Sequence, residues 1–539
     1  MSIMKIKNIL AVAAFAMAVH PSVAQSSIQN PMTQAVLAVY EEELRENPGD
    51  YNILMSRADE YYRHDEYIKA LADVDKVIQL APVSEEDVLL RAYVLRAGIY
   101  NETKRTEQAL EDLKKAASIA PDSYSVIYQK ANTEFTLGKY PEAKFDFQKL
   151  QRINPRGAEA YIGLARVAVK ENNLGIANEM LASAVNLDPN NAETYVRRAS
   201  VRRLMGDHNG AVDDLILAIS SDNKHPRAMQ ELIDYGNTNY PATMAGLSKA
   251  VTEAPQVGMY RYIRAMIAQA HFHYLAAIND YQTILDQRLY NYHGIYASIA
   301  ECNYCLGNYS EALDFIDRAL GMVRDNAGHY VLRSKILRAM GNYDEAVKAG
   351  AAALAVDRND NDALAEMALG YVGIGNYDEA SNLLGEAILN DAENPRFPML
   401  RAWIYEKYLN KQAAAEALYE KVADMQQFYI DNPRSLKGFA QLFLGQTELG
   451  RRWMDNILDT VEDYDGLIHY YGACFYAQFG DMDKAMELAD KSLNLGYANY
   501  HDWTEAIDGR VNVAPLRDDL RFLNMLHRHD AIFGKESKK

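Results

Sequence analysis

One cysteine pair is the first feature of this sequence whose residue type and spacing could carry chemistry. Cys302 and Cys305 form a CxxC motif, which at a helix N-terminus is typical of redox centres because the helix dipole lowers a thiol pKa. This pair falls late in an expected helix, just before Gly307, so we interpret it as two small buried packing residues. A strained local disulfide is the alternative. Cys474 is too distant in sequence to complete a zinc-ligand pattern.

Histidine pairs and acidic runs are the other candidates for chemistry. His-x-His occurs at residues 271–273 and 527–529, but on a helix positions i and i+2 point to different faces and chelate poorly. The acidic run at 41–43 is interpreted as a solvated face. The sequence has no P-loop, GxSxG or HExxH motif. We therefore predict no catalytic residue, no metal and no cofactor; an enzyme with an unrecognised site is a third hypothesis.

The composition is that of a globular protein with an acidic balance. The chain has 539 residues, 49% of them apolar and 24% charged, with a formal net charge of −18. An acidic balance argues against nonspecific nucleic-acid binding, which relies on Lys and Arg. Three cysteines in so long a chain exclude a disulfide-stapled scaffold.

The first 24 residues have the features of a targeting segment. Lys5 and Lys7 precede an apolar run over 9–19, and small residues end at Ala24. This order of charge, apolar run and small residues predicts a signal peptide cleaved before Gln25. We expect a periplasmic or otherwise extracytoplasmic protein without a transmembrane segment, since no later run reaches about 18 apolar residues.

Stepping along the chain, small residues recur every 34 residues. The first of each pair are Ala97, Ala131, Ala165 and Ala199, then Ala300, Ser334, Ala368 and Ala402. The second, twelve residues later, are Ala109, Ala143, Ala177 and Ala211, then Ala312, Ala346, Ala380 and Ala414. Glycines follow the first small residue at Gly138, Gly206, Gly307, Gly341, Gly375 and Gly480, and prolines follow the second Ala at Pro82, Pro121, Pro155 and Pro189. Each unit is therefore predicted to be a helix, a glycine turn, a second helix and a proline exit, with the small residues where the helices approach most closely.

This pattern resembles the tetratricopeptide repeat, and the chain is similar to secreted bacterial proteins of that family. The turns at 307–312, 341–346 and 375–380, each Gly-Asn-Tyr followed by Ser or Asp, Glu and Ala, are close to the family consensus. The resemblance implies an all-α fold, a right-handed superhelical solenoid of about thirteen helix-turn-helix repeats with helical caps.

The repeat phase predicts the organisation of the chain. The predicted segments are a signal peptide (1–24), an N-terminal capping half-repeat (25–50), a first arm of repeats (51–225), a degenerate repeat (226–257), a second arm (258–431), a second degenerate repeat (432–465), a last repeat (466–499) and a C-terminal capping extension (500–539).

The two degenerate repeats depart from the pattern in different ways. Residues 226–257 carry Tyr240-Pro241 in place of a turn glycine and Thr243 in place of the second Ala. Residues 432–465 have Gly450 as the expected turn glycine, with bulky residues after it. Either these repeats bend the solenoid or separate two arms, or they are sequence drift at constant geometry.

The resemblance also implies where a ligand binds, because in this family the first helix of each repeat lines a concave groove. The groove positions carried over to this sequence are Tyr128, Gln129, Asn132, Phe135, Arg166, Lys170, Arg197 and Arg203 in the first arm, and Tyr262, Tyr304, Tyr470 and Tyr471 further on. The first group is a basic strip with aromatics in an acidic protein, which favours an acidic peptide or a C-terminal carboxylate as ligand. The alternative is that its cations pair with neighbouring acids along a solvated groove.

The strip departs from the carboxylate clamp of some family members. Asn132 occupies the clamp's asparagine position, but Gly163 stands where a second asparagine is expected. We predict a non-enzymatic scaffold or adaptor that binds a protein or peptide, with no nucleic-acid partner. A cell-envelope component that binds glycans or secretion machinery is the alternative.

Overall fold

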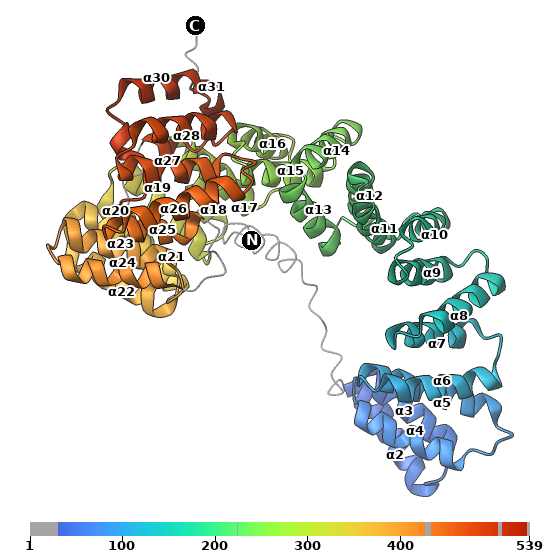
Figure 1. The fold of residues 1–539 in the computed structure, drawn as a ribbon. Coiled ribbons are helices and arrows are strands. Elements are labelled where there is room, and N and C mark those ends of the chain that lie inside the picture. Colours follow the sequence, from blue (N-terminus) through green and yellow to red (C-terminus); the bar gives the residue numbers. More distant parts are fainter. Residues whose placement is uncertain (1–30, 224, 426–432, 505–508, 536–539) are drawn as a thin grey trace. The chain divides into compact units, whose positions relative to one another are not determined.

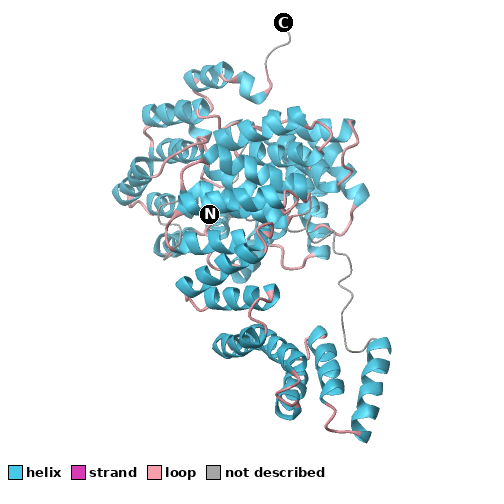
Figure 2. Cartoon of the chain, turned by 90° about the vertical axis from the view of Figure 1, so that its right-hand side faces the viewer, coloured by secondary structure: helices cyan, strands magenta, loops and turns pink. Residues whose placement is uncertain are grey.

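Helices, most of them in consecutive pairs, form the whole regular structure of the described residues. The computed structural model describes residues 31–223, 225–425, 433–504 and 509–535 (Figure 1). Within those ranges every regular element is an α-helix or a short 3-10 helix, as Figure 2 shows. The predicted all-α fold of consecutive paired helices is confirmed. The predicted signal peptide at 1–24 lies outside the described residues.

The chain divides into two compact units, residues 1–246 and 247–539. The first unit contains α2 (Pro31–Glu46), α3 (Tyr51–Arg63), α4 (Tyr67–Leu80), α5 (Glu86–Glu102), α6 (Thr106–Ile119), α7 (Tyr124–Thr136), α8 (Tyr140–Ile153), α9 (Ala158–Lys170), α10 (Leu174–Leu187), α11 (Ala192–Leu204), α12 (His208–Ser221) and α13 (Pro226–Thr238). The boundary falls within α14 (Tyr240–Glu253). It therefore lies inside the stretch 226–257, where the sequence departs from the repeat pattern.

The second unit continues the pairing. Its helices are α15 (Gly258–Ala270), α16 (Tyr274–Asp286), α17 (His293–Cys305), α18 (Tyr309–Met322), α19 (Ala327–Ala339), α20 (Tyr343–Val356), α21 (Asn361–Ile374), α22 (Tyr377–Asn390), α23 (Arg396–Lys407), α24 (Gln412–Asp424), η1 (Pro433–Ser435), α25 (Lys437–Phe443), α26 (Thr447–Thr460), α27 (Leu467–Phe479), α28 (Met482–Asn494), α29 (Tyr500–Thr504), η2 (Ala514–Leu516), α30 (Leu520–Arg528) and α31 (Asp530–Phe533).

The 34-residue pattern determines how each pair of helices is made. The small residues of both registers are buried at the contact between paired helices, for example Ala131 and Ala143 in α7 and α8. Ala414 is the exception, because it is half-buried and the neighbouring Ala415 of α24 is buried instead. The turn between α7 and α8 needs a left-handed residue, which Gly138 supplies with φ 73°. Where glycine is missing, another residue takes that conformation at the same repeat position, including Asn172 (φ 59°) and Phe272 (φ 63°).

A buried ion pair joins the two helices of five repeats, and sequence reasoning missed it. A basic residue in the first helix bonds an aspartate 16 residues later in the second: Arg57 with Asp73, Arg96 with Asp112, Lys130 with Asp146, Arg198 with Asp214, and Arg264 with Asp280. All five aspartates are buried.

The same two positions are apolar together in other repeats. The repeat of α9 and α10 has Leu164 and Met180 there, packed in one cluster. Buried charges are costly unless they are paired, so a basic residue at the first position needs a partner. Two repeats have alanine at the second position instead, and there Arg333 bonds Asp317 and Arg401 bonds Ser381 of the preceding helix. The correlated charge pattern was visible in the sequence as a signal for this contact.

The repeat at 432–465 differs from the expectation in its turn. The left-handed glycine is Gly445 (φ 77°), between the short α25 and α26. Gly450 lies inside α26, so its expected place in the turn was wrong. A Cβ on Gly450 would come within 2.6 Å of the Gly438 carbonyl oxygen, so this glycine permits a close approach of α25 and α26.

The C-terminal segment contacts residues far earlier in the second unit. In α29, His501 Nε2 lies 3.0 Å from the Tyr304 hydroxyl and His501 Nδ1 lies 2.8 Å from the Tyr309 hydroxyl. Lys535 donates to Asn308 Oδ1 at 3.1 Å. The extension therefore packs against α17 and α18 as well as following the last repeat.

Candidate ligand-binding site

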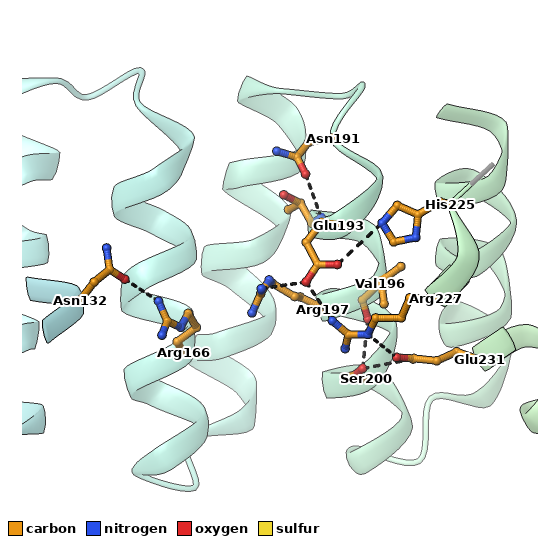
Figure 3. A network of polar contacts seen from close by, with 11 residues as sticks. Asn132, Arg166, Asn191, Glu193, Val196, Arg197, Ser200, His225, Arg227 and Glu231 are labelled. Atoms are coloured by element: carbon orange, nitrogen blue, oxygen red, sulfur yellow. Dashed lines mark hydrogen bonds and ion pairs between the residues drawn. The ribbon is translucent and has the colours of Figure 1, made fainter. Parts of the chain in front are cut away.

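The first helices of four successive repeats in the first unit carry most of the predicted basic strip. These are α7, α9, α11 and α13, and Figure 3 shows their polar side chains in two groups, one of Asn132 with Arg166 and one around Glu193. Arg166 of α9 points toward Asn132 of α7, while Arg197 of α11 and Arg227 of α13 converge on Glu193 (Figure 3).

Arg166 is a half-buried cation with a neutral partner. Its Nη1 donates to Asn132 Oδ1 at 2.6 Å, and its guanidinium lies 4.1 Å from the centre of the Phe135 ring. No carboxylate pairs with Arg166 among the described residues. Burial, with the nearby charge of Arg197, lowers the pKa of Arg166 below its usual value. The site therefore favours an added anion at this guanidinium.

The cations further along the row are partly neutralised. Glu193 accepts from Arg197 Nη2 at 2.7 Å and from Arg227 Nη1 at 2.8 Å, and Glu231 accepts from Arg227 Nε at 2.8 Å. Arg197 therefore fits the alternative that cations of the basic strip pair with neighbouring acids. Arg166 does not fit it, because its partner is the neutral Asn132.

A cavity of about 300 Å³ lies beside these groups. Its lining includes four of the predicted residues: Phe135, Arg166, Lys170 and Arg197. The rest of the lining is mainly apolar: Ala165, Val169, Leu181, Val201 and Leu204, with Ser200 and Arg227. Arg227 was missed because its repeat carries weak signatures, although it occupies the second position of the repeat, which the resemblance implies is a groove position.

The other predicted residues of the first unit do not belong to the cavity lining. The Tyr128 carbonyl accepts from Asn132 Nδ2 at 2.9 Å, and Gln129 Nε2 donates to Ser125 Oγ at 3.4 Å. Arg203 is exposed near the end of α11. Their role in binding stays a prediction.

The predicted tyrosines of the second unit are engaged in packing. Tyr262 is 7% exposed and its ring lies 6.0 Å from that of Tyr281. Tyr304 contacts His501, as described above. Tyr470 is 5% exposed, and Tyr471 packs edge-on against it at 5.7 Å. A binding role for these four residues stays a prediction, and the site in the first unit does not depend on it.

The cysteine pair is placed in the core. Cys302 and Cys305 are free and buried in α17, as is Cys474 in α27. Burial raises the pKa of both Cys302 and Cys305, so their thiols stay protonated at neutral pH and are poor nucleophiles. The interpretation of the CxxC pair as packing residues is confirmed.

The members of each histidine pair have separate surroundings. His271 lies 3.9 Å from Asp465, whereas burial lowers the pKa of His273. His527 pairs with Asp530, and His529 lies 3.8 Å from Asp490. In the part of the chain that the structure describes, no three metal-ligating side chains come together. The helices of that part also include none with the length and apolarity to cross a membrane.

Comparison with protein families finds tetratricopeptide repeats in both units. Residues 90–123 and 337–404 match models described as tetratricopeptide repeat. The first match covers α5 and α6, and the second runs from α19 to α23. The resemblance inferred from the 34-residue pattern is thereby confirmed for these stretches.

Curated relatives match parts of the chain at low identity. The human mitochondrial import receptor subunit TOM70 is 24% identical over 248 residues, which are 38% of this chain and 40% of the receptor subunit. The Hsp70-Hsp90 organizing protein of Triticum aestivum is 29% identical over 131 residues, or 24% of this chain and 21% of that protein. The chain therefore spans well under half the length of these relatives.

Two solved structures are similar to this chain at low identity and low TM-score. Yeast Tom70 is 16% identical, covers 76% of this chain and 99% of its own, and has a TM-score of 0.35. YrrB, described as a protein with an unusual peptide-binding site, is 20% identical, covers 36% of this chain and 96% of its own, and has a TM-score of 0.30.

Proposed function

We propose that this chain of tetratricopeptide repeats is a non-enzymatic scaffold or adaptor outside the cytoplasm, and that its first unit binds an acidic peptide or protein segment. Tetratricopeptide repeats generally mediate protein–protein interaction, and the names of the relatives describe a receptor subunit and an organizing protein. The ligand lies along α7, α9, α11 and α13.

Arg166 is the observation that carries this proposal. It offers guanidinium N–H donors beside an apolar cavity, its internal partner Asn132 is neutral, and Lys170 lies at the same cavity. A carboxylate binds guanidinium through charge-assisted, often bidentate hydrogen bonds. The helices already hold these groups in place, so little ordering entropy is lost on the protein side.

Photo-crosslinking tests where the partner binds. A photoreactive amino acid replaces exposed Lys170 at the cavity or, as the control, exposed Ile176 on α10 away from the cavity lining. We expect one protein to crosslink from position 170 and not from 176, and the Arg166→Glu/Arg197→Glu double variant to lose it. Equal crosslinking from both positions, or no protein adduct from position 170, would contradict the proposed site.

The proposed location has a separate test. The protein purified from cells that produce it naturally should begin at Gln25, because the predicted signal peptide is removed after Ala24. N-terminal sequencing together with cell fractionation measures this. An intact N-terminus in the cytoplasmic fraction would contradict the location and leave peptide binding to be judged by crosslinking.

A further inference from the structure

We propose that the cavity lined by α9, α10 and α11 takes one apolar side chain of the acidic ligand, while the flanking carboxylates bind Arg166 and Lys170. This inference rests on the proposed function and specifies its ligand: an acidic segment with an apolar anchor residue. An acidic segment without such an anchor would bind much more weakly.

The size and lining of the cavity favour a single side chain. About 300 Å³ is the lower end of the range for small-molecule sites, which are usually lined by apolar groups with a few polar ones. Three apolar residues of the lining are buried, Ala165 on α9, Leu181 on α10 and Val201 on α11. A leucine or phenylalanine side chain therefore suits the space better than a polar one.

Leu204 provides an independent indication of an apolar occupant. It belongs to the cavity lining at the end of α11, yet it is 64% exposed. Burying this side chain against a ligand would remove apolar surface from water, which is favourable. The exposed leucine therefore lies where an anchor residue would cover it.

The distribution of charge favours carboxylates beside the anchor. Four cations line the cavity, Arg166, Lys170, Arg197 and Arg227, and the lining contains no acidic residue. Glu193 and Glu231 pair with Arg197 and Arg227. Arg166 and Lys170 have no ion-pair partner among the described side chains, so the positive charge left for a ligand lies on the α9 side of the cavity.

The extent of the polar side chains along α7, α9, α11 and α13 favours a peptide ligand over a small molecule. Polar groups continue from the cavity toward α7 through Asn132 and toward α13 through Glu231, as Figure 3 shows. An extended peptide can use an anchor in the cavity and backbone contacts on either side. A small dianion would use the cations alone and gain nothing from the apolar lining.

Defined peptides separate the two parts of the proposal. The probes are fluorescein-labelled peptides with a Gly-Ser frame around Glu-Glu-Leu-Glu-Glu, Glu-Glu-Ser-Glu-Glu or Gln-Gln-Leu-Gln-Gln, titrated against the full chain by fluorescence anisotropy. We expect the first to bind, and each of the other two to bind at least tenfold more weakly. Equal binding of the leucine and serine peptides would overturn the anchor and retain the acidic-segment function.

Variants of the chain locate the binding. Leu204→Asp changes an exposed side chain, so the fold should persist while affinity for the leucine peptide falls at least tenfold. Arg166→Gln should weaken the acidic peptides at least tenfold, and Lys76→Gln, which removes an exposed cation from α4, serves as the matched control. If Lys76→Gln weakens binding of the acidic peptides as much as Arg166→Gln does, net charge alone drives binding and the proposed site is overturned.

Competition with free glutarate distinguishes a small-anion site. We expect a 1 mM excess to leave the leucine peptide bound, because the anchor supplies part of the affinity. Full displacement would assign the cavity to small dianions and overturn the inference. If none of the three peptides binds at 1 mM protein while crosslinking still captures a partner at position 170, the anchor inference fails and the scaffold function stands.

Discussion

Replacing Asp73 with alanine is expected to lower the free energy of opening of α3 and α4 by about 3–5 kcal/mol. Asp73 accepts from Arg57 Nε at 2.7 Å and from Arg57 Nη2 at 2.8 Å, and its side chain is 5% exposed. The hydrogen bonds to Asp73 raise the pKa of Arg57. Removing the carboxylate leaves the guanidinium largely buried without a counter-charge, which is the costly half of breaking an ion pair.

Hydrogen exchange is the measurement suited to this change. Repeats open locally and their stability is a sum of local and neighbour contributions, so the protection of the amides of α3 and α4 should fall by a factor of roughly 10² to 5 × 10³. Amides of the second unit should keep theirs. A loss below about 1 kcal/mol in α3 and α4 would contradict a stabilising role for the pair.

The repeat of α9 and α10, three repeats further along the chain, supplies the matched control. Leu164 and Met180 occupy the two positions in α9 and α10 without charge. The double variant Arg57→Leu/Asp73→Met should therefore lie within about 1.5 kcal/mol of the wild type, because replacing both members of a buried pair by apolar groups is often neutral or stabilising. A double variant as unstable as Asp73→Ala would show that packing at this site requires the charged side chains.

The second unit is expected to lose stability between pH 6.5 and pH 4 through His501. Burial lowers the pKa of His501 to about 4 from an ordinary value of 6.5. Arg338, Arg517 and Lys335 lower it further, and Glu366 opposes them. The unfolded state therefore binds more protons in this window, and stability rises with pH. The contribution of neutral His501 to the stability of the second unit is complete above pH 6.5 and is about 2.5 kcal/mol smaller at pH 4.5.

Protonation would also disturb the contacts that hold the C-terminal segment, because the tyrosine hydroxyl that donates to the unprotonated nitrogen of His501 must turn and accept instead. His501 is 6% exposed and its two ring nitrogens lie within hydrogen-bond distance of Tyr304 and Tyr309. A charged imidazolium can only donate at both nitrogens. The effect is expected at the contact between α29, α17 and α18.

Tryptophan fluorescence isolates this unit. The three tryptophans of the chain are Trp403, Trp453 and Trp503, all in the second unit. Urea unfolding measures the free energy of unfolding at pH 7.5 and at pH 4.5. The difference between the two values should be about 2.5 kcal/mol smaller in His501→Gln than in the wild type. Burial also lowers the pKa of His329 to about 4. His329 therefore contributes its own loss of stability at low pH, and the His501→Gln variant keeps that loss.

An exposed histidine provides the control for the pH experiment. The His527 side chain is 83% exposed, so His527→Gln should leave the difference between the two pH values as in the wild type. An unchanged difference in His501→Gln would show that another group carries the acid sensitivity of the second unit.

Local pattern explains why the repeats were predictable. Contacts between helices adjacent in sequence require a small residue such as Ala131 and a turn residue such as Gly138. The geometry of each repeat can therefore be predicted from its own residues. The turn at Gly445 was misplaced because α25 is only seven residues long, and the repeat phase no longer predicts the turn.

The candidate site was predictable to the extent that it follows the same phase. Arg166 and Lys170 lie at one cavity because both belong to the exposed face of one first helix. Whether each cation has a counter-charge depends on rotamers and neighbours, which the phase does not specify. Glu193 therefore neutralises Arg197 and leaves Arg166 with Asn132.

The sequence by itself determined the paired helices, their turns and the basic strip, because these depend on residues at most one repeat apart. Only the tertiary structure decided that Tyr304 meets His501, 197 residues later in the chain, and that Tyr262 and Tyr470 are buried. Side chains that are equivalent within the repeat pattern acquire different surroundings when distant segments pack on them. A contact between residues so far apart in the sequence leaves no periodic signal. Residues at equivalent repeat positions therefore line a cavity with cations in the first unit and belong to a packed core in the second.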